Sequence, residues 1–201
     1  MDTHFEQLLC ELHEALDVAA FQSAWRCVVA RHPTLRTSLR WQDLSEPRQE
    51  VHAQVELPWE EQDWRELTVS ERDKRVAEFL GSDRRRGFEL TRAPLFRLTL
   101  LRYGEAEFHI WTFHHAVLDG RSYALALREV IAFYESFRQG KEISLPIPRP
   151  YRHYIDWLQQ QDFSTDEAFW RETLKGFTTP TPLIVDHAPV TLPGHQSSQG
   201  N

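Results

Sequence analysis

The segment from about Glu107 to His115 constrains the fold of this chain more than any other. Its side chains alternate in the way expected of a β-strand, because successive residues of a strand point to opposite faces of the sheet. One face holds Phe108, Ile110, Thr112 and His114. The other face holds His109, Trp111, Phe113 and His115. The pattern predicts a central strand that ends in two adjacent histidines.

Local patterns predict further elements on both sides of this strand. The expected strands lie at residues 5–13, 35–41, 51–57 and 96–100. The expected helices lie at residues 18–32, 70–86, 122–139, 151–160 and 165–175. Their expected N-terminal caps are Asp17, Ser70 (with Asp73 in a capping box) and Ser122, and their expected terminating glycines are Gly87 and Gly140. The polar segment from Pro58 to Arg65 is expected to be a loop.

Length and composition favour one compact domain. The chain has 201 residues, of which 41% are hydrophobic, which is enough to build a core. The formal net charge of -7 argues against a nucleic-acid partner, because phosphate binding requires a basic face. The run Arg84–Arg86, beside Asp83, is interpreted as the solvated end of a helix. Cys10 and Cys27 are expected to be buried free thiols.

Neither an N-terminal signal peptide nor an apolar stretch long enough to cross a bilayer is found in the sequence. We therefore expect no membrane partner and a cytoplasmic location.

The adjacent histidines are the residues best suited to chemistry. Because neighbouring residues of a strand face opposite ways, His114 and His115 cannot both enter one cavity unless the backbone bends there, so one should be structural and the other available. A histidine that takes a proton from an attacking amine or alcohol can support direct acyl transfer between two bound substrates. Asp119 could order the loop after the strand by binding a cation or backbone amides, and the N–H of Gly120 could approach an oxyanion. No Gly-x-Ser-x-Gly nucleophile motif is present.

Two other interpretations of the histidines stay open at this point. Both side chains could serve only to pack the sheet or its surface. Alternatively, His114 or His115 could bind a metal together with Asp119, although no third ligand lies at a predictable spacing.

Residues His114 to Gly120 form the pattern HHxxxDG, which resembles a motif of the condensation domains of nonribosomal peptide synthetases. Four other segments resemble the same family: Arg31–Leu39 (RHxxLRTxF, with Leu39 in place of Phe), Phe88–Leu95, Tyr151–Trp157 (YxDFxxW, with His153 in place of Asp) and Phe169–Leu174. Their order and spacing agree from about residue 5 to 180. These domains belong to the chloramphenicol-acetyltransferase-like acyltransferases.

The resemblance implies an α/β fold, an α+β two-layer sandwich in which helices pack a mixed β-sheet. It also implies roles for individual residues. His115 is expected to be the active-site residue and to face a tunnel between two lobes. Asp119 is expected to form a structural ion pair with an arginine of the RHxxLRT segment, with Arg36 favoured over Arg31. His114 and Gly120 are expected to support the geometry.

The resemblance also implies that the chain matches only part of a condensation domain. Residues 1–177 correspond to the N-terminal lobe without its first strand segment, and residues 178–201 to a crossover or linker toward an absent C-terminal lobe. The chain alone is therefore expected to be a fragment with weak or no activity.

The activity that the resemblance implies is amide-bond formation. A donor thioester and an aminoacyl acceptor would be delivered on the phosphopantetheine arms of carrier proteins, with no cofactor or metal bound by the chain itself. Epimerisation and ester formation are rivals within the same fold. Two further alternatives are a free-standing acyltransferase that uses coenzyme A and a non-catalytic remnant that binds carrier proteins.

Overall fold

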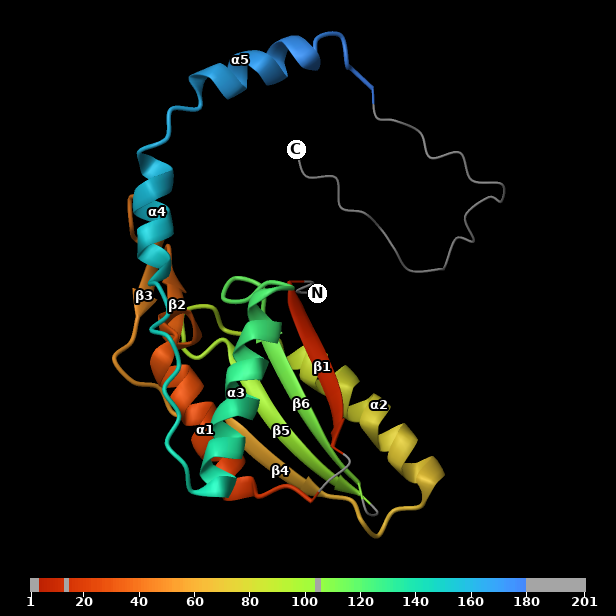
Figure 1. Cartoon of the computed structure of the whole chain (residues 1–201). Coiled ribbons are helices and arrows are strands. Elements are labelled where there is room, and N and C mark those ends of the chain that lie inside the picture. Colours follow the sequence, from red (N-terminus) through yellow and green to blue (C-terminus); the bar gives the residue numbers. More distant parts are fainter. Residues whose placement is uncertain (1–3, 13–14, 104–105, 180–201) are drawn as a thin grey trace. The chain divides into compact units, whose positions relative to one another are not determined.

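The computed structural model describes residues 4–12, 15–103 and 106–179 (Figure 1). The chain divides into two compact units, one that ends at Trp157 and one that begins at Leu158. The first unit contains the sheets and the core. The described part of the second unit contains one complete helix, α5 (Ser164–Thr173), which has no buried residue.

A four-stranded mixed sheet forms the centre of the first unit. Its strand order is β1 (Phe5–Leu12), β6 (Ala106–His114), β5 (Phe96–Tyr103) and β4 (Trp59–Asp63). Strand β6 lies between β1 and β5 and is antiparallel to both, whereas β4 runs parallel to β5. A separate hairpin pairs β2 (Thr37–Arg40) with β3 (Arg48–Val51). The predicted central strand is therefore confirmed, and its last residue is His114.

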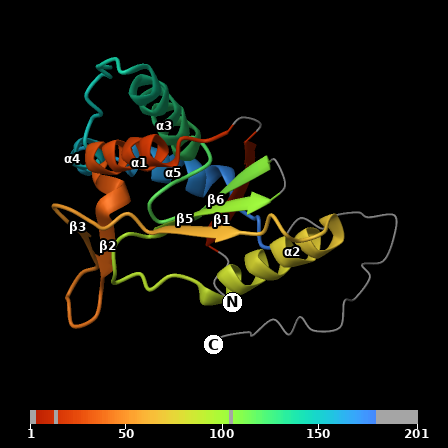
Figure 2. The same cartoon turned by 90° about the horizontal axis from the view of Figure 1, so that it is seen from below.

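Helices cover both faces of the central sheet (Figure 2). Helices α1 (Val18–Arg31) and α3 (Ser122–Gln139) pack together on one face, and α2 (Val69–Arg86) lies on the other. A short helix, η1 (Pro33–Arg36), follows α1, and α4 (Tyr151–Gln159) spans the boundary between the two units. Asp17 caps α1 as predicted, and its carboxylate accepts a hydrogen bond from the backbone N–H of Ala20.

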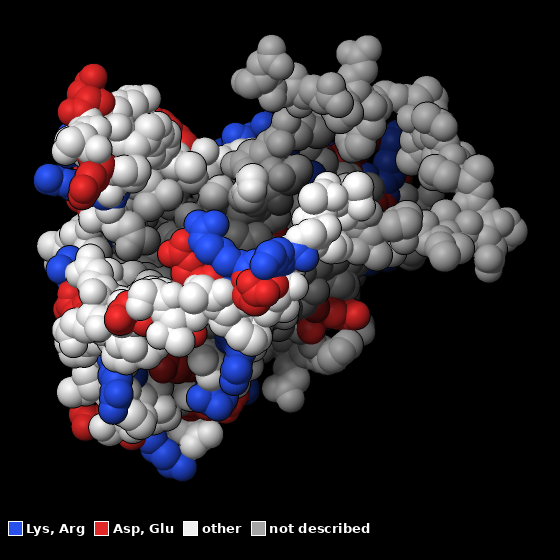
Figure 3. Space-filling view, turned by 90° about the horizontal axis from the view of Figure 1, so that it is seen from above, with Lys and Arg blue, Asp and Glu red and all other residues white. Residues whose placement is uncertain are grey.

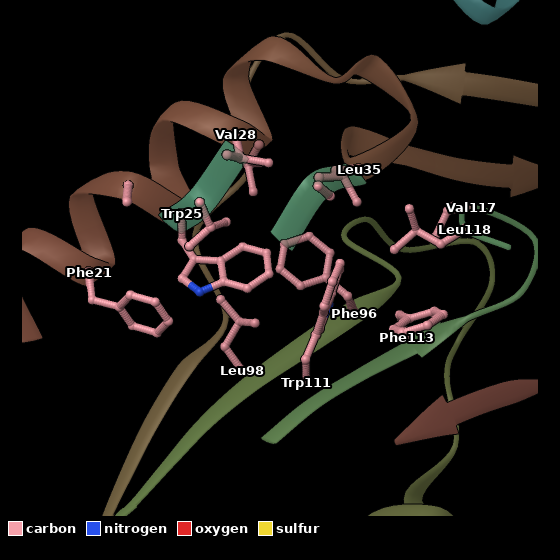
Figure 4. Close-up of a cluster of buried hydrophobic side chains, with 14 of the residues drawn as sticks. Phe21, Trp25, Val28, Leu35, Phe96, Leu98, Trp111, Phe113, Val117 and Leu118 are labelled. Atoms are coloured by element: carbon pink, nitrogen blue, oxygen red, sulfur yellow. The ribbon is translucent and has the colours of Figure 1, made fainter. Parts of the chain in front are cut away.

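The alternation along β6 divides the core into two clusters, as the sequence predicts. Trp111 and Phe113 point toward α1 and α3, where they pack with Trp25 of α1 and Phe96 of β5 (Figure 4). Ile110 points the other way and packs in a smaller cluster beneath α2. Burial on both faces favours large apolar side chains at consecutive positions of the strand.

A buried carboxylate fixes α2 to the sheet. Asp83 of α2 is 8% exposed, and it accepts hydrogen bonds from Arg97 of β5 (2.7 Å), Thr112 of β6 (2.7 Å) and Gln7 of β1 (2.9 Å). Burial opposes the ionisation of Asp83, but the Arg97 and Thr112 hydrogen bonds and the Arg97 charge outweigh it and lower its pKa. The basic run Arg84–Arg86 is exposed as predicted, whereas Asp83 is not part of that solvated helix end.

Several predicted element boundaries are wrong. Trp59 to Asp63 form strand β4 rather than a loop, because they pair with the distant residues Leu98–Arg102. The expected strand at residues 35–41 begins as helix η1, in which Pro33 occupies the first turn, and only residues 37–40 are extended. The return strand lies at residues 48–51 rather than 51–57.

The predicted capping box at Ser70 is also wrong. Helix α2 begins earlier, and Thr68 and Glu71 form the box, with Thr68 N–H donating to Glu71 at 2.8 Å. The predicted helix ends at Gly87 and Gly140 are confirmed, and both glycines have positive φ.

On the face shown in Figure 3, acidic and basic side chains are interspersed. Within the described residues, no helix combines the length and apolar character needed to cross a membrane.

Candidate active site

The candidate site lies where β6 ends and the loop to α3 begins. Two backbone hydrogen bonds hold this strand end between its neighbours. The N–H of His114 donates to the carbonyl of Leu95 (3.0 Å), and the N–H of His115 donates to the carbonyl of His4 (2.7 Å). A further bond from Val117 N–H to the His114 carbonyl (3.1 Å) turns the chain away from the sheet. Both histidines therefore project from a backbone that is held on two sides.

His114 is buried and packs on the α2 side of the sheet. The residue is 7% exposed, and its ring lies edge-on to Phe88 at 6.2 Å between centroids. Its Nδ1 accepts a hydrogen bond from the backbone N–H of Ala116 at 3.0 Å. A ring nitrogen that accepts such a bond carries no proton, so a ring proton of His114 belongs on Nε2. This environment suits a structural role in the turn.

His115 reaches the surface. Its side chain is 38% exposed, and its ring is flanked by two hydrogen-bond acceptors. Nδ1 lies 3.2 Å from the carbonyl oxygen of Leu118, and Nε2 lies 3.1 Å from Oε1 of Glu6 on β1. The division of the pair into one buried and one accessible histidine agrees with the strand alternation. Glu6 was not among the residues expected at the site, because its proximity depends on the pairing of β1 with β6.

The predicted ion pair of Asp119 is not formed. Asp119 is exposed, and its carboxylate accepts hydrogen bonds from the backbone N–H groups of Arg121 (3.1 Å) and Ser122 (2.8 Å) and from the Ser122 hydroxyl. These bonds lower the pKa of Asp119, and the bond from the Ser122 hydroxyl lowers it the most. Asp119 thus supplies the capping carboxylate at the start of α3, whereas Ser122, the predicted cap, is the first helical residue.

Both candidate partners of Asp119 are engaged elsewhere. Arg36 donates to the backbone carbonyls of Val29 (3.1 Å), Ala53 (3.0 Å) and His52. The fold explains this correction for Arg36. The residue closes η1 instead of lying on a strand, and there it meets carbonyls of the last turn of α1, which lack partners within the helix.

Arg31 joins α1 to α3 through a residue that was not expected at the site. Its Nε lies 3.0 Å from Glu129, and His32 Nε2 lies 2.8 Å from the same carboxylate. Burial opposes the ionisation of Glu129, but the hydrogen bonds from His32 and Arg31 outweigh it and lower the pKa of Glu129. Arg31 and His32 of the RHxxLRT segment therefore help to hold together the two helices on this face of the sheet.

Gly120 does not need the conformational freedom that was expected of it. Its φ lies outside the left-handed region, and a Cβ atom placed on it would have no neighbour within 4 Å. The suggested contact of its N–H with an oxyanion stays a prediction.

Across the described part of the chain, no group of three or more His, Cys, Asp and Glu side chains is placed to hold a metal ion. Cys10 and Cys27 are both free, as expected, but the expected burial is wrong, because both are only partly buried.

Comparison with known proteins identifies relatives across nearly the whole chain. A family model described as "Condensation domain" matches residues 2–199. A linear gramicidin synthase protein of Brevibacillus parabrevis is 44% identical over 176 residues, which cover 87% of this chain and 2% of that protein. Chondramide synthase cmdD of Chondromyces crocatus is 40% identical over 187 residues, which cover 92% of this chain and 5% of that protein. The chain thus spans a small fraction of the relatives it matches.

Two solved structures share the fold. The starter condensation domain of rhizomide synthetase aligns with a TM-score of 0.76 and 19% identity, over 88% of this chain and 43% of that chain. The epimerization domain from the third module of tyrocidine synthetase B aligns with a TM-score of 0.77 and 20% identity, over 92% of this chain and 43% of that chain. The expected chloramphenicol-acetyltransferase-like fold is therefore confirmed.

Proposed function

Because the chain belongs to the condensation-domain family of nonribosomal peptide synthetases, we propose that it takes part in amide-bond formation by acyl transfer. The donor is an acyl or peptidyl thioester, and the acceptor is an aminoacyl thioester. Each is delivered on the phosphopantetheine arm of a carrier protein. In this proposal the chain binds no cofactor or metal of its own.

The observation that carries the proposal is the accessibility of one imidazole at a fixed strand end. The His115 side chain is 38% exposed, whereas the neighbouring His114 is buried. The backbone of His115 is held by a hydrogen bond to His4. A histidine in this setting can meet a substrate without being displaced by it, and such positioning alone can supply a large part of a rate enhancement.

The chemistry needs no protein nucleophile. The amine lone pair attacks the thioester carbonyl carbon, and the carbonyl electron pair moves onto oxygen. When the carbonyl forms again, the carbon–sulfur bond breaks and the thiolate leaves. His115 either takes a proton from the amine nitrogen or holds the amine in line for attack, and both roles place its imidazole beside the acceptor amine.

The neighbouring residues are proposed to shape the site. His114 supports the turn through its bond with Ala116, and Asp119 fixes the start of α3 by capping it. The exposed Gly120 is available to place its N–H near the developing oxyanion. His114 and Asp119 thus act on the geometry around His115. Among the three residues, only the Gly120 N–H would contact a reacting atom.

The rest of a condensation domain is proposed to complete the site. The aligned residues make up 43% of each of the two solved chains, so more than half of those chains has no counterpart in the alignment. Three aromatic side chains on α4 are also about half exposed in the first unit: Tyr151, Tyr154 and Trp157. We therefore expect weak or no turnover from the 201 residues alone.

A condensation assay with two loaded carrier proteins tests the proposal. The 201-residue chain is compared with a chimera that joins it to the segment following the matched residues in chondramide synthase cmdD. We expect the chimera to form the amide product, detected as an increase in mass of the acceptor carrier, and the chain alone to form little. A folded chimera without product contradicts the proposed function. Robust product from the 201-residue chain alone contradicts the proposal that the rest of a condensation domain is needed to complete the site.

Epimerisation is a second candidate, favoured by the equally close structural similarity to the tyrocidine synthetase epimerization domain. The same samples discriminate the two reactions. Solvent deuterium that enters the α-carbon of a carrier-bound aminoacyl group, without amide formation, indicates epimerisation.

A further inference from the structure

The pairing of β1 with β6 places a carboxylate beside the candidate catalytic histidine. Glu6 lies directly opposite Phe113 in the antiparallel register, so the two side chains share one face. His115 lies two residues beyond Phe113 and therefore projects on the same side, at a diagonal position that a long side chain can reach. The distance of 3.1 Å between Glu6 Oε1 and His115 Nε2 shows that Glu6 does reach it.

The two contacts of the His115 ring cannot both be satisfied by a neutral imidazole. Nδ1 faces the Leu118 carbonyl at 3.2 Å, and Nε2 faces the Glu6 carboxylate. Both partners are acceptors, and a neutral imidazole has only one N–H to donate. The carboxylate is the stronger acceptor of the two, because hydrogen bonds to charged groups are the stronger ones. Glu6 therefore competes with the Leu118 carbonyl for the single ring proton and favours its place on Nε2.

We propose that Glu6 is a positioning residue whose carboxylate moves between two partners. Without substrate it accepts a hydrogen bond from Nε2 of His115, and when the acceptor enters it pairs with the ammonium group of the acceptor instead. The inference rests on the proposed function, because it assigns the acceptor amine to the neighbourhood of Nε2. The Glu6 and His115 side chains are 43% and 38% exposed, so the pair between them is weak and can open at little cost. The released carboxylate then faces the positively charged ammonium group of the acceptor.

The proton balance of this exchange is simple. The acceptor arrives as an ammonium ion with three protons on nitrogen. When Glu6 leaves, the solvent-exposed ring gives its Nε2 proton to water and takes one from water at Nδ1, against the Leu118 carbonyl, so the ring stays neutral and Nε2 is bare. One ammonium proton then passes to Nε2. One leaves with the thiolate as the thiol, and one remains on the amide nitrogen. The carboxylate of Glu6 keeps its charge throughout and stabilises first the ammonium and then the protonated His115.

Nuclear magnetic resonance of the 201-residue chain tests the resting contact without any need for turnover. Long-range correlations between ring nitrogens and carbon-bound protons report which nitrogen of His115 carries the proton, with all variants recorded at the same pH. We expect a proton on Nε2 in the wild type. In Glu6→Gln the side-chain amide donates to Nε2, so we expect the proton on Nδ1 and a bare Nε2.

Glu11→Gln is the matched control, because it removes the same charge from the same strand, where Glu11 pairs with Phe108 far from the site. It should leave the His115 pattern as in the wild type. A bare Nε2 in the wild type, or the same ring pattern in the wild type and in Glu6→Gln, would overturn the proposal.

Kinetics of the chimera test the transfer to the acceptor. In Glu6→Gln, KM for the aminoacyl carrier should rise by about threefold to fivefold, the size expected for a partly exposed charge pair, with a smaller change in kcat. Glu11→Gln should leave both constants unchanged. An unchanged KM in Glu6→Gln would overturn the transfer to the ammonium. Absence of condensation in every variant would overturn the proposed function instead, while the resonance pattern still decides the contact of Glu6.

Discussion

At the scale of single residues, Asp119 shows how a local contact can satisfy a carboxylate that was expected to have a distant partner. Its carboxylate binds two backbone N–H groups and a hydroxyl within three residues of itself. The N-terminus of a helix offers unpaired N–H groups and a favourable dipole, so an aspartate just before it is already stabilised. An ion pair with Arg36 is then unnecessary for holding the loop.

Asp119→Ala should lower the melting temperature of the chain, because the first turn of α3 loses its cap. Asp119→Asn and Asp119→Ser should lower the melting temperature much less, because these side chains can also cap a helix. In a double-mutant cycle of Asp119→Ala with Arg36→Ala, measured by urea unfolding, the two effects should add. A clear coupling energy between the two sites would show that the predicted ion pair forms after all.

His109 is a polar side chain enclosed by the core. It is 2% exposed and lies among aromatic rings, with centroids 5.0 Å from Phe21 and 5.7 Å from Trp25. Neither ring nitrogen meets a partner in good hydrogen-bond geometry among the described residues. Burial disfavours the charged form and lowers the pKa of His109 to about 3, and the backbone of Thr99 offsets only part of this effect.

This histidine should make the stability of the chain depend on pH. Below a pH of about 6.5 the unfolded chain binds a proton at His109 that the folded chain refuses, so the free energy of unfolding should fall as the pH drops from about 6.5 toward 3. The slope from this one group is at most about 1.4 kcal/mol per pH unit. His109→Phe should remove this component in urea unfolding at a series of pH values. Parallel pH profiles of the two proteins would contradict the prediction.

At the scale of helices and strands, the start of α2 is set by a reciprocal pair of hydrogen bonds. Thr68 and Glu71 each satisfy a backbone N–H of the other. Thr68→Ala should therefore lower the free energy of unfolding by about 1 kcal/mol. Ser70→Ala, at the cap position that the sequence suggested, should have little effect, because Ser70 already lies inside the helix. Chemical denaturation measures both, and an equal loss in the two variants would argue against the observed box.

The elements that could be predicted from the sequence are those whose signals are local. The two faces of β6 follow from alternation within nine residues, and α1 is marked by its cap and by the spacing of Phe21, Trp25 and Val28. Strand β4 lacks such a signal. Its alternation is interrupted by charged residues, and it is a strand because of its parallel pairing with β5, which is distant in the sequence.

In the candidate site, too, only the features with a local sequence signal could be predicted. The division between His114 and His115 follows from strand geometry, and the resemblance selected His115. The contact with Glu6 depends on the register between β1 and β6, which no local pattern reveals. The expected pairing of Asp119 came from the resemblance alone, and η1 turns Arg36 toward the end of α1 instead.

At the scale of the whole molecule, the first unit contains all of the described core. The two clusters of buried side chains are built from elements between β1 and α3, and α5 buries none of its residues. Ending the chain after Gln161 should therefore leave cooperative unfolding and its midpoint unchanged within error, as measured by thermal denaturation. A broad transition or a large fall in the midpoint would show that the second unit contributes to the core.

The rate of amide formation by the His115→Ala chimera, in single turnover with both carriers loaded, tests most directly whether this exposed imidazole acts on the acceptor amine. The substitution removes a partly exposed ring, so the melting temperature should stay close to that of the parent chimera. The rate should fall by at least about a hundredfold, the contribution typical of a positioned general base. A folded His115→Ala chimera that forms amide at the parental rate would contradict the role of His115.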